Sequence, residues 1–209
     1  PTGDGTTSVT GLSAGTWSCT ITDANSCTGT QTFNITQPGA ISITPASQTN
    51  VSCNGSSNGA ASINTPTGGA GGYTYNWTPG NPTGDGTTSV TGLTAGTWTC
   101  TVTDANTCSK SQTFTITQPT AISSTTVVTN VSCNGGSNGA INLTPTGGTP
   151  GYTFNWGGGV TTEDRTGLIA GSYTYTITDA NGCTNTSTVS LTEPSAIATT
   201  TSITNILCN

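Results

Sequence analysis

The amino-acid sequence repeats itself, and the length of the repeat restricts what the chain can fold into. Residues 1–38 and 82–119 align without a gap at an offset of 81, and only eight of the 38 aligned positions differ. A third copy follows 75 residues further on, where Cys108 matches Cys183. A period of 75–81 residues is too long for one coil of a solenoid. Each repeat is therefore expected to be a small domain of its own.

Side chains alternate within each copy as they do in β-strands. In residues 97–103, TWTCTVT, Trp98, Cys100 and Val102 share one face and threonines occupy the other. This period of two indicates a half-buried strand, and clusters of Gly and Asn between such runs indicate turns. No segment shows a helical period. About six short strands in each repeat predict an all-β fold of tandem immunoglobulin-like β-sandwich repeats without helices.

The repeats also predict how the chain divides. Residues 1–53 are expected to form a partial first repeat that lacks its N-terminal strands, residues 54–133 the second repeat and residues 134–209 the third. Because the chain opens inside a repeat, we expect it to be part of a longer protein. No run approaches the roughly 18 apolar residues that a membrane-spanning helix needs, so membrane insertion is not expected.

Charged side chains are scarce, and their scarcity excludes several classes of function. They make up 5% of the chain, against roughly a quarter in an ordinary soluble domain. The only cations are Lys110 and Arg165, and the net charge is -6. Without a basic patch to neutralise phosphates, the chain is not expected to bind nucleic acid. There is also no His to activate the many Ser and Thr hydroxyls, so we do not expect an enzyme.

Eight cysteines in a chain with so little charge indicate an oxidising compartment and structural disulfides. A zinc site is not expected, because the chain has neither His nor a CxxC pair. Cys19 and Cys100 are replaced by Tyr175 in the third copy and are predicted to be free thiols in the core. The other six cysteines recur with the repeat and are predicted to form disulfides: Cys27, Cys53, Cys108, Cys133, Cys183 and Cys208.

Two pairings of these six cysteines agree with the repeat. The first joins Cys27–Cys53, Cys108–Cys133 and Cys183–Cys208, with separations of 26, 25 and 25 residues. It is favoured because a hairpin turn at residues 118–121, QPTA, would bring Cys108 and Cys133 opposite each other. The second joins Cys53–Cys108 and Cys133–Cys183 within a repeat. The sequence leaves both open.

The recurring segment TDAN, which precedes the second cysteine of each copy, has two interpretations. Asp104 and Asn106 can bond to their own backbone, as Asx residues do in hairpin turns. The alternative is a calcium site, which needs several carboxylates in one loop, whereas each turn offers one. Asp4 and Asp85 of the GDG segments would add a second carboxylate if they lay nearby. We favour the turn and expect no cofactor.

Tryptophan recurs at fixed places in the repeats. A Trp on a middle strand is typical of an immunoglobulin-like core, where it fills the space between the sheets. The alternative is an exposed ring that stacks on sugars. The predicted core aromatics are Trp17, Trp77, Trp98 and Trp156.

The motifs of the third copy resemble, as a set, the SprB-type repeat of very large cell-surface adhesins of gliding Bacteroidota. The matching pieces are Cys133–Gly135, Gly147–Gly148, Tyr152–Trp156, Gly167–Leu168, Gly171, Tyr173 and Asp179–Cys183, and the second copy matches at the same places. The resemblance implies a secreted, tandemly repeated β-domain on a surface filament, exported by the type IX pathway and serving adhesion or gliding motility. It carries over no catalytic residue. Cys19 and Cys100 depart from the usual pattern, in which an apolar or aromatic residue is common.

These observations favour a structural repeat module of an extracellular stalk or filament, with neighbouring repeats of the same chain as its partners. A variant is a subunit of a self-assembling multi-chain fibre. Thr-rich strand edges with few charges would let identical chains pair, because charge is the usual protection of such edges.

A binding module is the alternative class of function. A flat ladder of hydroxyls could bind ice or glycans, although β-prone sequences also carry Thr on their solvent face for no such reason. The ladder would consist of Thr97, Thr99, Thr101, Thr103, Thr113, Thr115 and Thr117. Sequons at Asn34, Asn76 and Asn185 would also accept glycans in a host that attaches them.

Overall fold

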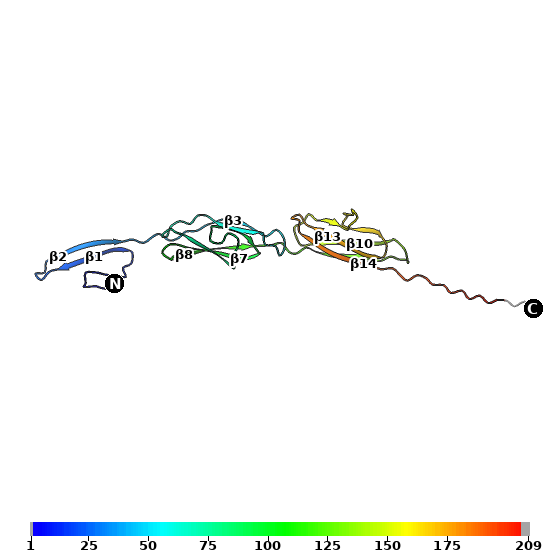
Figure 1. Ribbon diagram of the computed structural model, residues 1–209, viewed down its shortest axis with the longest axis horizontal. Coiled ribbons are helices and arrows are strands. Elements are labelled where there is room, and N and C mark those ends of the chain that lie inside the picture. The colour runs from blue at the N-terminus through cyan, green and yellow to red at the C-terminus, as the bar shows by residue number, and fades with distance from the viewer. Residues whose placement is uncertain (1, 206–209) are drawn as a thin grey trace, which may run out of the picture. The chain divides into compact units, whose positions relative to one another are not determined.

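The computed structural model of the protein describes residues 2–205 and folds them into fourteen β-strands without a helix (Figure 1). Nothing in this range is therefore a helix that could cross a membrane. The strands follow the alternation of the sequence. In β7, Gly96–Thr103, the side chains of Trp98, Cys100 and Val102 are buried, and the threonines between them are partly exposed.

The first element is an antiparallel hairpin of β1, Gly15–Thr22, and β2, Thr28–Ile35. These two strands make up a sheet of their own, and the face that carries its apolar side chains is open to solvent. Trp17 is half-buried and Cys19 is exposed. The predictions that Trp17 and Cys19 lie in a core are therefore wrong, because no second sheet covers this hairpin within the described residues.

Two three-stranded sheets follow, with the strand orders β3-β4-β6 and β5-β7-β8. The chain thus passes from one sheet to the other between β4 and β5, between β5 and β6 and between β6 and β7, as it does in a β-sandwich. The strands are β3, Pro45–Thr49; β4, Gly59–Ile63; β5, Thr74–Thr78; β6, Ser89–Leu93; β7, Gly96–Thr103; and β8, Ser109–Ile116.

The last six strands repeat this connectivity, in the orders β9-β10-β12 and β11-β13-β14. They are β9, Ser123–Thr129; β10, Gly139–Thr146; β11, Thr153–Asn155; β12, Arg165–Leu168; β13, Gly171–Thr178; and β14, Thr184–Leu191. Strands β9–β14 therefore have the same strand order and the same connections as strands β3–β8. The prediction of an all-β fold of immunoglobulin-like β-sandwich repeats is confirmed.

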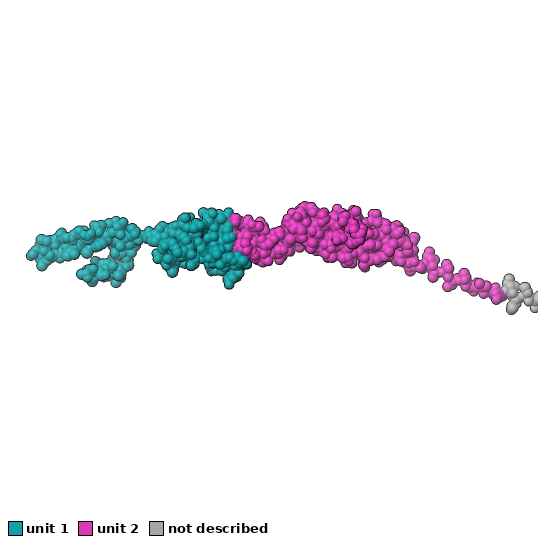
Figure 2. All heavy atoms as spheres, turned by 45° about the horizontal axis from the view of Figure 1, so that its top comes forward, with its two compact units in different colours: residues 1–46, 62–89, 99–113 teal, residues 47–61, 90–98, 114–209 magenta. Residues whose placement is uncertain are grey.

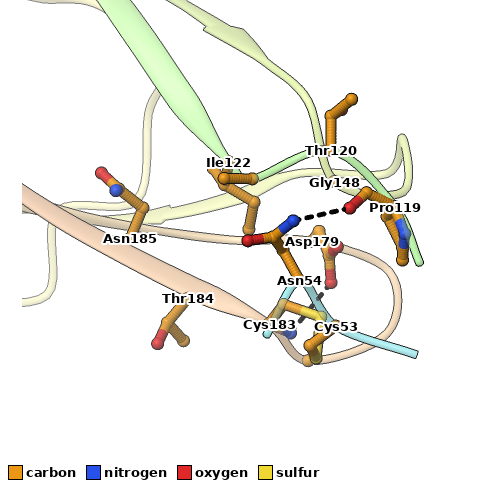
Figure 3. Close-up of a pocket in the computed structure, with 12 residues that line it drawn as sticks. Cys53, Asn54, Pro119, Thr120, Ile122, Gly148, Asp179, Cys183, Thr184 and Asn185 are labelled. Carbon is orange, nitrogen blue, oxygen red and sulfur yellow. Dashed lines mark hydrogen bonds between the residues drawn. A yellow bond between two sulfur atoms is a disulfide. The ribbon is translucent and has the colours of Figure 1, made fainter. Parts of the chain in front are cut away.

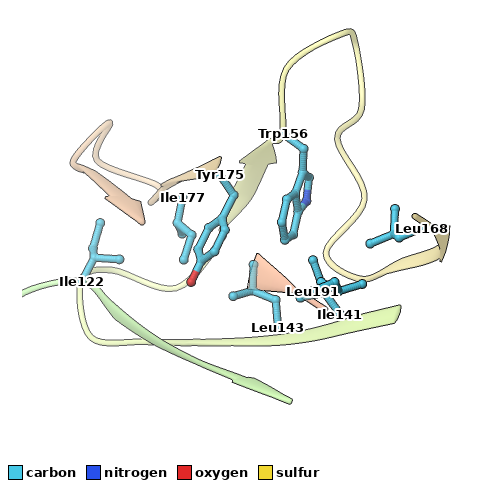
Figure 4. Packing of buried hydrophobic residues seen from close by; sticks show 8 residues of the cluster. All are labelled: Ile122, Ile141, Leu143, Trp156, Leu168, Tyr175, Ile177 and Leu191. Atoms are coloured by element: carbon cyan, nitrogen blue, oxygen red, sulfur yellow. The ribbon is translucent and has the colours of Figure 1, made fainter. Parts of the chain in front are cut away.

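Both sheets of the β9–β14 set contribute to one hydrophobic core (Figure 4). At its centre, the rings of Trp156 and Tyr175 lie 4.8 Å apart between centroids and are tilted by 45°. Their polar atoms are satisfied, since Trp156 Nε1 donates to the carbonyl of Thr162 at 2.8 Å and the Tyr175 hydroxyl bonds Ser124 Oγ at 2.9 Å. The buried members are Ile122, Ile141, Leu143, Trp156, Leu168, Tyr175, Ile177 and Leu191.

In the β3–β8 set, a cysteine takes the place of the core tyrosine. Trp77 of β5 pairs with Cys100 of β7, and both side chains are fully buried. Cys100 is a free thiol, and its burial raises its pKa from 9.0 to about 11, with a smaller contribution from the charge of Asp85. Trp77, Trp98 and Trp156 are all buried, whereas Trp17 is not.

The chain divides into two compact units (Figure 2). The first comprises residues 1–46, 62–89 and 99–113, and the second comprises residues 47–61, 90–98 and 114–209. The predicted domain boundaries after residues 53 and 133 fall in the loops between β3 and β4 and between β9 and β10. The division at these two places stays a prediction.

Candidate functional site

A disulfide joins Cys53, in the loop between β3 and β4, to Cys183, in the turn between β13 and β14 (Figure 3). The Cα atoms of the two cysteines are 5.6 Å apart, and 130 residues separate them in the sequence. The bond therefore links a loop of the β3–β8 set to a hairpin of the β9–β14 set. We call residues 52–58 the acceptor loop and residues 179–183 the donor turn.

Asp179 shapes the donor turn through its carboxylate. One oxygen, Oδ1, accepts hydrogen bonds from the backbone N–H of Asn181 and of Cys183, both at 2.9 Å. The other oxygen, Oδ2, accepts the N–H of Thr149 at 2.9 Å. These bonds, with that from Thr149 the largest contributor, lower the pKa of Asp179 below its ordinary value, although burial opposes them. The turn predicted from TDAN is thus formed, and Cys183 is fixed at its end.

Gly148 lets a neighbouring loop approach this carboxylate closely. Its φ of +61° lies in the left-handed region, and a Cβ there would sit 2.7 Å from both Asp179 Oδ2 and Ile122 Cγ1. Any larger residue would separate the loop from the turn. The repeated Gly-Gly pair of the sequence therefore serves the turn that carries the bonded cysteine.

The acceptor loop is held by side-chain amides. The Ser52 N–H donates to Asn58 Oδ1 at 3.0 Å, and Asn58 Nδ2 returns a bond to Ser52 Oγ at 2.6 Å. The segment after β8 fixes the loop from the other side. Gln118 Oε1 accepts the N–H of Gly55 at 2.8 Å, and Asn54 Nδ2 donates to the carbonyl of Pro119 at 3.0 Å.

Asn181 supplies a polar contact beside the disulfide. Its Nδ2 donates to the carbonyl of Ser52 at 3.1 Å and to Thr149 Oγ1 at 2.9 Å. A cavity of about 380 Å³ adjoins the bond, and both the acceptor loop and the donor turn line it (Figure 3). The acceptor loop and the donor turn are thus joined by a disulfide and by a hydrogen bond, with polar groups around them.

The structure contradicts both predicted cysteine pairings, because neither contains Cys53–Cys183. The error comes from the segment at residues 118–121. It does not turn a hairpin, since β8 and β9 on either side of it belong to different sheets. Of the other cysteines predicted to be bonded, Cys27, Cys108 and Cys133 are free and exposed, and Cys208 lies outside the described residues.

A calcium site finds little support at the predicted carboxylates. The part of the chain that the structure describes holds no cluster of three or more His, Cys, Asp or Glu side chains. Asp85 Oδ1 accepts the N–H groups of Trp77, in β5, and of Gly86, in its own loop, at 2.8 and 2.9 Å, so its bonds hold this loop to β5. Asp104 accepts backbone bonds from Ala70, Asn106 and Cys108, as Asp179 does in the later copy.

The Ser and Thr hydroxyls of neighbouring strands bond to one another. On β13 and β14, three pairs of hydroxyls bond across the strands, at 3.1, 2.9 and 2.9 Å: Ser172–Ser190, Thr174–Thr188 and Thr176–Thr186. The earlier hairpin has the pairs Thr99–Thr113 and Thr101–Ser111, at 3.4 and 3.0 Å. Cross-strand hydroxyl pairs of this kind stabilise a sheet by themselves. A row of Thr therefore needs no ligand to explain it.

Residues 45–82 and 125–161 match the family model of the SprB repeat. No curated protein matches the chain. Several solved structures resemble it at low sequence identity. The N-terminal eight immunoglobulin domains of Down Syndrome Cell Adhesion Molecule are 11% identical with a TM-score of 0.43, and the match covers 86% of this chain but only 28% of that one.

A fragment of intimin and two domains of an S-layer protein are also among the similar structures. A C-terminal fragment of intimin, solved with the intimin-binding domain of its translocated receptor, is 14% identical at a TM-score of 0.35, with 71% of this chain and 64% of that chain covered. Domains 4 and 5 of the S-layer protein SbsC are 17% identical at a TM-score of 0.32, with 75% and 97% covered. Scores this low carry no argument about function.

Proposed function

We propose, from the premise that residues 45–82 and 125–161 are SprB-type repeats, that this chain is a structural module of an extracellular stalk or filament. SprB repeats occur in cell-surface proteins, and the match at these residues supports a surface repeat module. The finer proposal is that it serves adhesion or gliding motility, is exported by the type IX pathway and performs no catalysis. Its partners are the neighbouring repeats of its own chain.

The Cys53–Cys183 disulfide is the observation that carries this proposal. It closes 130 residues into a covalent loop. A force applied to the chain outside this loop cannot pull out the residues inside it, which would otherwise add about 450 Å at roughly 3.5 Å per residue. A bond that limits extension suits a tether under load. A disulfide also stabilises a domain that bears no load, so the limit on extension is the property that favours the tether.

The experiment is carried out on intact cells of the organism that encodes the chain. An antibody against the chain should label cells without permeabilisation, and the label should disappear when the type IX machinery is deleted. A strain that lacks these repeats should attach or glide less well than its parent. Labelling that requires permeabilisation, or attachment and gliding that are unchanged, would contradict the proposal.

A self-assembling fibre is the second candidate, and one observation favours it. The apolar face of hairpin β1–β2 is uncovered within the described residues, with Ile21 71% and Phe33 51% exposed. Small-angle scattering of the purified oxidised chain across a concentration series separates the two candidates. The mass of a single chain at every concentration supports the stalk module, and a mass that grows with concentration supports the fibre.

The ice- or glycan-binding alternative rests on the Thr rows, whose hydroxyls are paired across the strands. Thermal hysteresis in a solution of the chain would restore the ice-binding version. We expect none.

A further inference from the structure

We propose that Cys133 and the cavity beside it form a second acceptor site, which binds and covalently captures the cysteine-bearing hairpin of a further repeat of this type. The site lies in the loop between β9 and β10, at residues 132–138. Its occupant is a β-hairpin with the donor turn Asp-Ala-Asn-x-Cys. The inference rests on the repeat architecture and not on a role in adhesion or motility.

The loop at Cys133 is built as the acceptor loop at Cys53 is. The Ser132 N–H donates to Asn138 Oδ1 at 3.1 Å, and Asn138 Nδ2 returns a bond to Ser132 Oγ at 2.8 Å. The corresponding bonds in the acceptor loop are 3.0 and 2.6 Å. Cys133 therefore has the local backbone support that Cys53 has when it is bonded.

Each of the two loops is also held by the segment that follows a last strand, β8 for the loop at Cys53 and β14 for the loop at Cys133. Glu193 Oε2 accepts the N–H of Gly135 at 2.8 Å, where Gln118 serves Gly55 at the same distance. Asn134 Nδ2 donates to the carbonyl of Pro194 at 3.2 Å, and Asn54 does so to Pro119 at 3.0 Å. The Cys133 loop thus has the conformation of an acceptor loop without an occupant.

The cavities beside Cys53 and Cys133 are lined by equivalent residues on one side and differ on the other side. The cavity at Cys133, of about 370 Å³, is lined by residues 132–134 and 194–197. Counterparts of most of these residues line the cavity at Cys53, which is closed on its other side by Gly148, Asp179 and Cys183. Only the half that a donor hairpin supplies is missing from the lining at Cys133.

The isoleucine that lies beside each cavity differs in exposure between the two sites. Ile122, which lines the cavity at Cys53, packs against Gly148 of the donor hairpin's own domain and is 8% exposed. Ile197 occupies the matching place at Cys133 and is 95% exposed. The isoleucine at this position is thus buried where the strands that carry a donor turn pack around it, as is usual for a large aliphatic side chain.

The hairpin that would dock has its shape before it is bonded. At Cys108, Asp104 Oδ1 accepts the N–H of Asn106 at 2.9 Å and of Cys108 at 3.0 Å, as Asp179 does in the bonded turn. Cys108 nevertheless carries a free, exposed thiol. A preformed turn loses little conformational freedom on docking. In the docked state, its Asn is expected to donate to the carbonyl of Ser132, as Asn181 does to Ser52.

The covalent step is thiol–disulfide exchange with a soluble low-molecular-weight disulfide, such as glutathione disulfide. One protein thiolate attacks the reagent, which releases one glutathione thiol and leaves a mixed disulfide. The second protein thiolate attacks the protein sulfur of this mixed disulfide and releases the second glutathione thiol. Two protein thiols are thereby oxidised to one disulfide, and one reagent disulfide is reduced to two thiols.

The test uses the whole chain, extended by a duplicate of its own sequence. Residues 195–209 align with residues 120–134, so a second copy of residues 135–209 placed after Asn209 completes one further repeat. The extended chain is oxidised in glutathione buffers and its disulfides are mapped by peptide mass spectrometry. We expect Cys133 to be bonded to the copy of Cys183, with an equilibrium constant within about tenfold of that of Cys53–Cys183.

Two results would overturn the inference. One is that Cys133 is recovered as a free thiol, or bonded to any other cysteine, while Cys53–Cys183 forms. The other is an equilibrium constant for the Cys133 bond that is about a thousandfold or more below that of Cys53–Cys183. The extended Cys133→Ser variant is the control for folding, since it must still form Cys53–Cys183. The map is read in vitro, so its failure is separate from a failure of the surface function.

Discussion

Hairpins β1–β2 and β7–β8 have almost the same sequence, but the apolar side chains of the first are exposed and those of the second are buried. Val102 of β7 is fully buried and Phe114 of β8 is 4% exposed. Their counterparts in the first hairpin are Ile21, which is 71% exposed, and Phe33, which is 51% exposed. The difference shows that pattern and turn chemistry are enough to form a hairpin, whereas burial also requires a second sheet.

The turns of the two hairpins support this conclusion. Asp23 Oδ1 accepts the N–H of Asn25 at 2.9 Å and of Cys27 at 2.8 Å, and Asp104 makes the equivalent bonds in the buried hairpin. Local bonds are therefore the same whether or not the face is covered. The hairpins differ in the free energy that burial of their apolar faces adds.

The largest expected difference follows from truncating the two phenylalanines. Phe114→Ala should lower the free energy of unfolding by about 3–5 kcal/mol, because it leaves a cavity in a packed core. Phe33→Ala should change it by less than about 0.5 kcal/mol, because the ring is half in solvent. Urea unfolding of both variants measures the difference. Equal losses would mean that β1–β2 is packed in solution.

The disulfide gives the next difference, between the exposed first hairpin and the bonded hairpin β13–β14. Cys183→Ser should cost about 2–4 kcal/mol, since a loop of 130 residues is no longer closed in the unfolded chain. Cys27→Ser, at the matching turn, should cost less than about 0.5 kcal/mol. Unfolding midpoints under non-reducing conditions provide the measurement. A Cys183→Ser variant as stable as the parent chain would show that Cys53 and Cys183 are not bonded in solution.

Thiol reactivity distinguishes Cys19 from Cys100, which occupy the same place in the two hairpins. With its pKa raised to about 11, Cys100 has about 100-fold less thiolate than a thiol of pKa 9.0. Iodoacetamide at pH 8 should modify the exposed Cys19 at least about 100-fold faster than Cys100. Peptide mass spectrometry over time follows both sites in one sample. Comparable rates would place Cys100 in solvent.

The smallest effect is expected at the acidic turns. The pKa of Asp104 is lowered in the folded state, chiefly by the N–H of Ala70. Its contribution to stability is therefore present above its ordinary pKa near 3.8 and is lost as the pH falls through the folded value. Asp104→Asn should flatten the decline of stability below about pH 4. Denaturant unfolding at pH 2–7 tests this expectation, and an unchanged decline would contradict it.

Most of the strands could be predicted from the sequence, since alternation and turn residues act over short distances. The β-sandwich connectivity also followed, because the repeat length and strand count allow few other folds. The cysteine pairing could not be predicted. It depends on whether residues 118–121 turn a hairpin or lead into another sheet, and the QP segment is compatible with either.

The Cys53–Cys183 site could not be predicted from the sequence either, although its parts were visible there. Cys53 and Cys183 were both singled out by their recurrence, as was the turn before Cys183. Cys53 and Cys183 belong to two different kinds of loop, each of which recurs with the repeat, and this recurrence was the sequence signal for a bond between such loops. It does not say which copy of one loop is bonded to which copy of the other.

The sequence by itself determined the strands, the turns and the repetition of one β-domain, since these follow from side-chain alternation and from short-range hydrogen bonds. Only the tertiary structure decided which equivalent positions are buried and which cysteines bond. Cys19 and Cys100 have nearly identical neighbours along the chain and differ in whether a second sheet covers them. Cys53 and Cys133 have the same loop, and within residues 2–205 only Cys53 is bonded to a donor turn.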